Sequence, residues 1–381
     1  MTKRTLLYFA TFVVSLAALF SGCKSDKQPQ SNHLEAVIDG TVKYAKGFSI
    51  ENTNDYTKVT IHNPWQKGEA YAVYYLCETD SCHTPMDGFR VQIPLQSVVV
   101  NTFSYFEFFR LLNELPAVSG VTDGFRVYNP FVLEGLKNGD IVDLGDPFNP
   151  NVEKTMALKP QAIVKSAYAQ QDTYNERLLN AGLPIIYSLE WMENSPLGKA
   201  EWIKLVAAFF DKQALGDSLF NEIETHYLET VALVENISQK PTVLAGDNFQ
   251  GTWYVPGGKS FNAQLFSDAA LDYYYKNHKE SGSIGLDIET ILTQFGDADT
   301  WFGCEATSYE ELKKKDSKYG LLKAVKNQKV YNNHNRVTPQ GGNDYFESAI
   351  ANPHLLLADY IKAAHPELVP QHEFTYIKPL R

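Results

Sequence analysis

The feature that most restricts the fold of this chain is an alternation of short apolar runs with helical patterns between residues 97 and 189. The first run contains three consecutive valines, and the apolar residues that follow it recur every three or four positions. Continuous valine and isoleucine runs that alternate with amphipathic helices are typical of a parallel sheet with helices on both faces. We therefore expect an α/β fold with strand 97–102, strand 117–121, helix 151–158, strand 162–164, helix 173–181 and strand 184–189.

A second block of the same kind follows a long helical stretch at residues 213–236, where an apolar stripe keeps three- and four-residue spacing. One hydrophobic core rarely serves more than about 250–300 residues. We therefore predict two Rossmann-like lobes joined by one helix: an N-terminal lobe at 34–212, a connecting helix at 213–238 and a C-terminal lobe at 239–381. The second block is predicted to contain strand 242–245, helix 262–271, helix 286–295, strand 299–302, strand 329–332 and helix 344–364.

The residues before the valine run have a different pattern. Short alternating segments from 34 to 96 are separated by Asn, Asp, Gly and Pro, which predicts a strand-rich N-terminal elaboration of the first lobe. Cys77 and Cys82 bracket four polar residues between two of these segments. In an oxidising compartment this pair can close as a disulfide, but the spacing alone leaves its oxidation state open.

The beginning of the chain indicates export. Two basic residues precede an apolar run at 6–20, which is shorter than the about 20 residues that a membrane-spanning helix requires. The run ends in Ser-Gly-Cys, and this end resembles the bacterial lipobox, in which the cysteine is lipidated and becomes the mature N-terminus. We expect a lipoprotein signal peptide at 1–22, lipidation of Cys23, a polar tether at 23–33, and a place in the cell envelope, facing the periplasm or the outer side of the cytoplasmic membrane.

Charge and missing motifs exclude several functions. The formal net charge is −11, whereas a nucleic-acid partner requires a basic face. The sequence contains no HExxH, no G-x-S-x-G and no G-x-G-x-x-G after a strand, so metalloprotease, α/β-hydrolase and dinucleotide-binding functions lack their residues. The nine histidines are scattered. We therefore expect no catalytic residue, no cofactor and no directly bound metal ion.

Glu153 and Glu289 hold equivalent places in a faint internal repeat. Each lies in the first turn of a predicted helix, seven residues before a proline or glycine. A glutamate there is favourable in any case, because it faces the positive end of the helix dipole. From the residues alone, the two are either simple helix-start acids or a matched functional pair.

Several segments carry a family resemblance, namely 145–153, 157–160, 190–204 and 341–347. With the lipobox and the single connecting helix, they resemble the substrate-binding lipoproteins of ABC importers over residues 97–367, and most closely the ferric-siderophore and cobalamin group. The resemblance implies a receptor that binds a small molecule between two lobes without catalysis and delivers it to an ABC permease dimer. It also implies that Glu153 and Glu289 pair with arginines of the two permease subunits.

A receptor for a chelated metal needs flat aromatic walls and a few charges. Ligands of open parallel sheets bind beyond the carboxyl ends of the strands. Arg336 follows a polar loop after a predicted strand, where a cation can pair with an anionic group of the ligand. The predicted ligand-binding residues are Tyr105, Tyr128, Tyr168, Trp191, Trp253, Tyr254, Trp301 and Arg336.

The resulting prediction is a monomeric, lipid-anchored receptor for an iron chelate of the ferric-siderophore type, with contact to the membrane through its lipid only. A cobalamin or haem receptor of the same fold is the alternative, and an envelope enzyme with an unrecognised nucleophile is a remote one. The sequence does not choose among siderophore, cobalamin and haem, or between inner and outer membrane.

Overall fold

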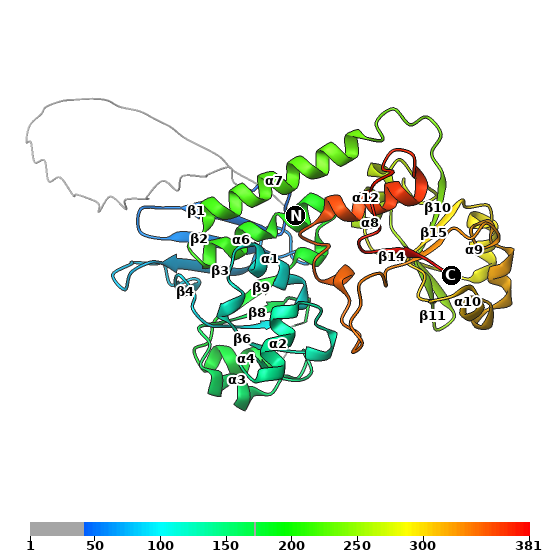
Figure 1. The fold of residues 1–381 in the computed structure, drawn as a ribbon. Helices are drawn as coiled ribbons and strands as arrows, with labels where there is room; N and C mark the ends of the chain where they lie inside the picture. The colour runs from blue at the N-terminus through cyan, green and yellow to red at the C-terminus, as the bar shows by residue number, and fades with distance from the viewer. Residues whose placement is uncertain (1–41, 171–172) are drawn as a thin grey trace, which may run out of the picture. The chain divides into compact units, whose positions relative to one another are not determined.

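The computed structural model describes residues 42–170 and 173–381, and in it the valine run forms the central strand of a five-stranded parallel sheet (Figure 1). The sheet has the order β7-β6-β5-β8-β9, so the order of the strands reverses between β5 and β8. Such a switch point leaves a crevice at the carboxyl ends of the two strands. The strands are β5 (Val98–Asn101), β6 (Val118–Val121), β7 (Val142–Asp143), β8 (Ala162–Ser166) and β9 (Ile185–Ser188).

Helices and short 3-10 turns connect these strands and follow the last of them. They are η1 (Phe103–Tyr105), α1 (Phe106–Leu111), η2 (Leu115–Ala117), η3 (Gly124–Arg126), α2 (Pro130–Asn138), α3 (Val152–Leu158), α4 (Thr173–Asn180), η4 (Glu190–Met192), α5 (Pro196–Ala200) and α6 (Trp202–Phe209). The predicted long helix is α7 (Gln213–Ala232), which follows this N-terminal lobe. The predicted limits of the two lobes stay predictions.

The C-terminal lobe is built on a second five-stranded sheet of order β13-β10-β15-β16-β17, in which only the edge strand β17 runs antiparallel. A three-stranded antiparallel sheet of order β11-β12-β14 accompanies it. Its strands are β10 (Thr242–Ala245), β11 (Asp247–Phe249), β12 (Thr252–Pro256), β13 (Asp272–Tyr273), β14 (Ser283–Leu286), β15 (Thr300–Phe302), β16 (Val330–Asn332) and β17 (Lys378–Pro379). Its helices are α8 (Phe261–Asp268), α9 (Ile288–Phe295), α10 (Tyr309–Lys315), η5 (Ser317–Leu321), α11 (Lys323–Lys326), η6 (Asp344–Phe346) and α12 (Pro353–Ala364).

The predicted final helix at 344–364 is wrong at its beginning. Residues 344–346 form only a 3-10 turn, and α12 begins at Pro353. Proline has no N–H and disfavours helical backbone in the residue before it, and Asn352 indeed has φ −125° and ψ 53°. The proline therefore begins this helix instead of lying within it.

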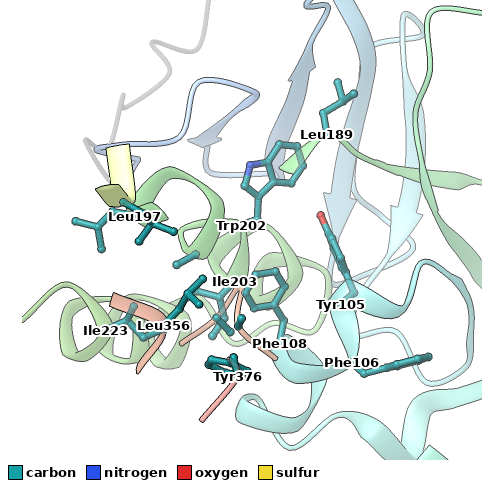
Figure 2. Packing of buried hydrophobic residues seen from close by; sticks show 14 of the residues in the cluster. Tyr105, Phe106, Phe108, Leu189, Leu197, Trp202, Ile203, Ile223, Leu356 and Tyr376 are labelled. Carbon is teal, nitrogen blue, oxygen red and sulfur yellow. The ribbon is translucent and has the colours of Figure 1, made fainter. Parts of the chain in front are cut away.

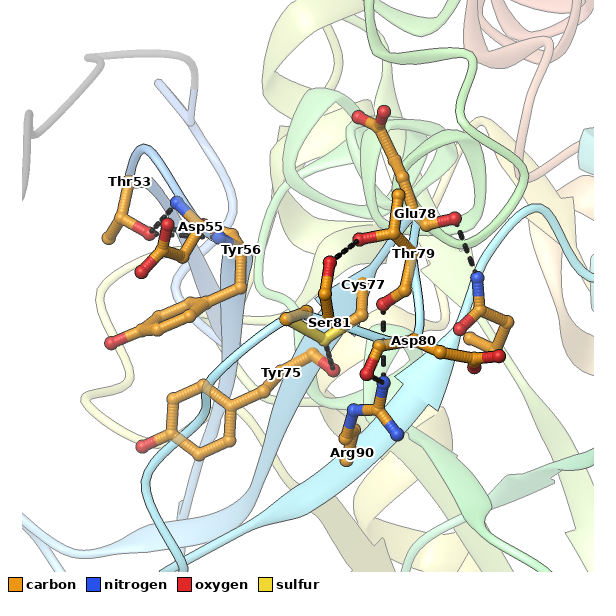
Figure 3. Close-up of a disulfide and its surroundings, with 12 residues drawn as sticks. Thr53, Asp55, Tyr56, Tyr75, Cys77, Glu78, Thr79, Asp80, Ser81 and Arg90 are labelled. Carbon is orange, nitrogen blue, oxygen red and sulfur yellow. Dashed lines mark hydrogen bonds between the residues drawn. A yellow bond between two sulfur atoms is a disulfide. The ribbon is translucent and has the colours of Figure 1, made fainter.

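The strand-rich N-terminal segment forms its own sheet of order β1-β2-β3-β4. The strands are β1 (Phe48–Asn52), β2 (Thr57–His62), β3 (Ala70–Cys77) and β4 (Phe89–Gln92). Cys77 and Cys82 are joined by a disulfide at the end of β3, with their Cα atoms 5.8 Å apart (Figure 3). The side chain of Arg90 on β4 donates to the backbone oxygens of Thr79 and Asp80, which fastens the bridged loop to the sheet (Figure 3).

Two buried carboxylates attach the segment that leads into this sheet. The Glu201 carboxylate accepts the backbone N–H groups of residues 43, 44 and 45 at 2.7, 2.6 and 2.8 Å. Glu193 accepts those of Lys46 and Gly47 at 2.9 and 2.8 Å, and also the indole N–H of Trp202 at 3.1 Å. Because both acids lie in the N-terminal lobe, the sheet is hydrogen-bonded to that lobe and not merely packed on it.

The core around α6 joins elements that are far apart in sequence. Every residue of α6 is buried. Figure 2 shows Trp202 and Ile203 of α6 with Phe108 of α1, and Ile223 of α7 near Leu356 of α12. None of the described helices is long and apolar enough to cross a membrane. The predicted signal peptide, the lipidation site Cys23 and the tether lie outside the described residues.

Candidate functional site

A cavity of about 220 Å³ lies at the switch point of the five-stranded β5–β9 sheet. Its lining comes from the carboxyl ends of β5 and β8 and from the loops after β6 and β7. Because parallel strands end at the same edge of the sheet, residues distant in sequence meet there. The lining residues are Asn101, Thr102, Phe103, Thr122, Asp123, Arg126, Pro147, Phe148, Lys165, Ser166 and Tyr168.

A hydrogen-bond chain holds the floor of this cavity. The buried Asn101 amide accepts the hydroxyl of Thr122 at 2.8 Å and donates to the backbone oxygen of Pro147 at 3.0 Å. The loops after β6 and β7 are therefore tied to the end of β5. Asp123, in the first of these loops, has a left-handed backbone with φ 50°, and its N–H donates to the oxygen of Gly145 in the second loop.

Two cations border the cavity. Lys165 is a buried lysine in β8, and its ammonium donates to the Asn175 amide at 2.9 Å and lies 5.0 Å from the ring centre of Tyr174. Arg126 is half-exposed, lies 3.6 Å from the Asp123 carboxylate and covers the ring of Phe103. The cavity thus offers amide, hydroxyl and cationic groups beneath an apolar rim.

That rim continues as a row of exposed aromatic side chains. Phe148, Tyr168 and Trp191 come from the loops after β7, β8 and β9, and their exposed fractions are 65%, 43% and 42%. The ring centres of Phe148 and Tyr168 are 5.9 Å apart, and those of Tyr168 and Trp191 are 5.8 Å apart. Exposed aromatic rings in contact cost free energy in water, so a continuous row of them indicates a surface that meets a ligand or partner. We call Phe148, Tyr168 and Trp191 the aromatic row.

The structure brings two of the predicted ligand residues, Tyr168 and Trp191, together in this row. Tyr105 is not among them, because its side chain has no exposed surface and packs edge-on against Phe108. Within the described residues the Tyr105 hydroxyl has no hydrogen-bond partner. The prediction for Tyr105 is corrected: in the 3-10 turn η1 its ring points into the core.

The predictions for Trp253 and Trp301 are corrected in the same way. Both indoles are fully buried, with ring centres 4.9 Å apart. Their N–H groups donate to the backbone oxygens of Ala245 and Gly246. With no exposed surface and no free donor, the two rings form core of the C-terminal lobe and do not line a ligand-accessible surface. Tyr254, next to Trp253 on β12, is half-exposed.

Tyr128 and Arg336 line a different cavity, of about 320 Å³. There the Arg336 guanidinium is 3.1 Å from the Asp344 carboxylate, so its charge already has a partner. The backbone N–H of Tyr128 donates to the Glu347 carboxylate at 2.8 Å. Burial raises the pKa of Glu347 to about 8, and the neighbouring Asp344 charge adds to this rise. The cavity is therefore a polar junction between the loop after β6 and the segment after β16.

Some residues of the candidate site were not predicted, because the sequence marks them only weakly. Lys165 interrupts an apolar strand, and Asn101 ends one. A polar residue at the end of a buried strand was the only sequence feature that pointed to them. Phe148 lies in a loop rich in proline, glycine and asparagine, where nothing distinguishes an exposed ring from a buried one. Within the described residues, no group of three or more His, Cys, Asp or Glu side chains is arranged to hold a metal ion.

Glu153 and Glu289 begin their helices in the same way. The side chain of Asn151 caps α3 by accepting the N–H of Lys154 at 2.8 Å, and that of Asp287 caps α9 by accepting the N–H of Thr290 at 2.7 Å. Each glutamate is exposed in the first turn after its cap. The two differ in one respect, because the Glu289 carboxylate accepts a hydrogen bond from the Lys318 ammonium at 2.8 Å.

Comparison with known proteins agrees with this architecture. A model of the periplasmic binding protein family matches residues 98–337, which is more than half of the chain, and the chain therefore belongs to this family. An uncharacterised lipoprotein of Methanocaldococcus jannaschii is 26% identical over 402 residues, covering 96% of this chain and 94% of the relative. Membership makes the chain a periplasmic binding protein rather than an enzyme.

Two solved structures show the same fold at low sequence identity. A possible iron-binding (periplasmic solute-binding) protein of Staphylococcus epidermidis has a TM-score of 0.56 and 17% identity, over 71% of this chain and 99% of that one. The periplasmic vitamin B12 binding protein of Vibrio cholerae has a TM-score of 0.51 and 13% identity, over 71% of this chain and 96% of that one. The family match begins at residue 98, so the β1–β4 sheet precedes it.

Proposed function

We propose that this protein captures an iron chelate of the ferric-siderophore type and delivers it to an ABC permease. The observation that carries the proposal is the aromatic row of Phe148, Tyr168 and Trp191, which lies beside the polar cavity at the sheet switch point. Small-molecule sites combine apolar walls with a few well-placed polar groups, and this arrangement has both. The Staphylococcus epidermidis neighbour is a possible iron-binding protein, which supports the same ligand class.

The chemistry of a ferric chelate suits this surface. Its apolar or aromatic parts can lie on the exposed rings, which removes their apolar area from water. Its anionic donor groups can meet Arg126 and the polar floor formed by Asn101 and Thr122. A bare metal ion would gain little from the aromatic rings, whereas a chelated metal has the flat organic surface that such rings contact.

Cobalamin or haem is the second candidate. A row of rings from three successive loops offers a flat contact to a macrocycle, and the Vibrio cholerae neighbour is a vitamin B12 binding protein. Tyr254 and Arg336 remain secondary candidates for ligand contact. Arg336 would first have to leave Asp344, since the two side chains are paired.

We further propose that Glu153 and Glu289 dock the loaded protein on the permease dimer. Their helix starts have matching caps, and both side chains are exposed. Exposed charges at an interface affect the rate at which two proteins meet and their relative orientation more than the affinity of the complex. We also propose that the protein acts as a monomer attached to the envelope through lipid on Cys23.

Native mass spectrometry of the full-length protein with ferric siderophores, haem and cyanocobalamin tests the ligand class. We expect one unmodified ferric siderophore per protein chain. Tyr168→Ala/Trp191→Ala should weaken this binding strongly, whereas Phe131→Ala, which removes an exposed ring on α2, should not.

Exclusive binding of cobalamin or haem would select the second candidate. Binding that is unchanged in Tyr168→Ala/Trp191→Ala would remove the aromatic row from the site. Chemical alteration of a bound molecule would contradict the receptor function altogether.

A further inference from the structure

A second and larger cavity, of about 710 Å³, lies beside the β1–β4 sheet, which we call the N-terminal sheet. It is lined by β1 and β2, by the loop between β2 and β3, by the segment around η4, and by Ser281 of the C-terminal lobe. This volume is within the range of small-molecule sites.

The cavity is lined by three lysines and three glutamates. The lysines are Lys46, Lys58 and Lys67, and they lie in a chain with a formal net charge of −11. The acids beside them are partly engaged. The Glu193 carboxylate accepts three N–H groups, and Glu51 lies 3.7 Å from Lys58. Among the described residues, Lys46 and Lys67 have no acidic partner within 4 Å, and Glu69 is the remaining carboxylate.

This cavity and the aromatic row involve the same two segments of the chain. Leu189, before η4, and Met192, its last residue, line the cavity, and Trp191 lies between them in the sequence. Ala70 also lines it, and the next residue, Tyr71, donates its hydroxyl to the backbone oxygen of Tyr168 at 3.1 Å. The cavity and the aromatic row are therefore connected through neighbouring residues of the same two segments.

We propose that this cavity is a subsite for a carboxylate arm of the ligand, with Lys46 and Lys67 as its cationic partners. The inference rests on the proposed function, because the aromatic row must hold the body of the chelate. A carboxylate in the cavity would meet ammonium groups that have no other acidic partner, and charge-assisted hydrogen bonds of this type are stronger than neutral ones. The N-terminal sheet thereby contributes to ligand choice.

Matched pairs of chelates test the subsite on the full-length protein. One pair is haem and its dimethyl ester, which differ only in two carboxylates. The other is a neutral ferric trihydroxamate and the same chelate with an appended carboxylate. At low salt we expect the protein to bind the carboxylate member at least about tenfold more tightly, and the preference to shrink as salt screens the charges.

Lys46→Ala/Lys67→Ala should abolish this preference and leave affinity for the neutral member unchanged. The control Lys137→Ala/Lys326→Ala removes two exposed lysines on α2 and α11 and should preserve the preference. Circular dichroism verifies that both variants are folded.

Equal affinity for the two members of a bound pair, or a preference that survives in Lys46→Ala/Lys67→Ala, would overturn the subsite and leave the proposed function intact. Failure of every chelate to bind would contradict the proposed function, and the subsite would fall with it.

Discussion

The hydroxyl of Tyr71 donates a hydrogen bond of 3.1 Å to the backbone oxygen of Tyr168 and thereby connects the N-terminal sheet to the middle of the aromatic row. The ring of Tyr71 also lies edge-on against Tyr187 at the end of β9, with ring centres 4.9 Å apart. The loop that carries Tyr168 is thus supported by a strand that lies before the family match. The β1–β4 sheet is therefore in direct contact with the loop that carries Tyr168.

Tyr71→Phe should weaken ligand binding without unfolding the protein. The change removes one hydrogen bond and keeps the ring, so we expect a loss of about 0.5–1.5 kcal/mol of stability. Because the Tyr168 loop loses a support, affinity should fall severalfold in calorimetric titration. Tyr274→Phe is the control, since it removes a hydroxyl from an exposed ring just after β13. Identical affinity in Tyr71→Phe and wild type would show that this bond does not position the row.

Iodide quenching should separate Trp191 from the other tryptophans. Trp191 and Trp65 are 42% and 37% exposed, whereas Trp202, Trp253 and Trp301 have no exposed surface. Quenching should therefore decrease in Trp191→Phe and almost vanish when Trp65→Phe is added. Saturating ligand should protect Trp191. Quenching that persists in the double variant would mean that a core tryptophan is accessible in solution.

The pKa of Glu347 predicts how stability depends on pH. Burial first, and then the Asp344 and Glu107 charges, raise this pKa to about 8 from its ordinary value near 4.5, although N–H groups of residues 128 and 129 oppose the rise. An acid with a raised folded-state pKa holds a proton that the unfolded chain releases. Its stabilising contribution is therefore complete below about pH 4.5 and is lost as the pH rises to 8.

Glu347→Gln should remove that part of the pH dependence. Because one pKa unit corresponds to about 1.4 kcal/mol, the wild type should lose on the order of a few kcal/mol between pH 5 and 8 relative to the variant. Urea denaturation of both proteins across this range measures the difference. Parallel curves would show that Glu347 is not protonated in the folded protein.

The valine run explains why the fold could be predicted so well. A strand buried on both faces must be apolar at every position, and Val98, Val99 and Val100 are at most 1% exposed. Apolar periodicity does not reveal α6. This helix is buried on every side, so no polar face alternates with an apolar one every three or four residues. A helix of that kind is recognisable only once its neighbours α1, α7 and α12 are known.

The site was predicted only in part, for a geometrical reason. Tyr168 and Trp191 follow their strands and are exposed, as expected of residues beyond a strand end. Trp301 instead lies within β15, and Trp253 within β12, which is paired on both sides. The predicted strand 299–302 already contained Trp301, so the error was to treat a ring within a strand as one beyond its end. Trp253 was misplaced because no strand was predicted at β12.

Glu153→Ala/Glu289→Ala should abolish stimulation of ATP hydrolysis in a reconstituted permease while ligand affinity stays normal. As helix-start acids alone, each should contribute about 0.3–1 kcal/mol to stability. Glu134→Ala/Glu310→Ala, which removes two other exposed acids, is the control. Lys318→Ala should improve stimulation, because it frees Glu289 from its ion pair. Full stimulation by the Glu153/Glu289 double variant would end the docking proposal.

Cys77→Ser/Cys82→Ser should lower the free energy of unfolding by about 2 kcal/mol, because the bridge closes a short loop in the unfolded chain. Cys304→Ser, at the buried free cysteine, is the comparison that changes no bridge. Denaturation with and without a reducing agent measures the effect. If reduction leaves the unfolding curve unchanged, the bridge does not contribute to stability.

Glu193 and Glu201 depend on a part of the chain that precedes the family match. Both carboxylates are buried in the part of the chain that the family match covers, yet most of their hydrogen bonds go to residues 43–47, which precede it. A buried carboxylate without such partners is costly. We therefore expect the sheet and the two acids to occur together in related sequences. Family members without the β1–β4 sheet are expected to carry uncharged residues where this chain has Glu193 and Glu201, and substitutions that remove one feature should be found with loss of the other.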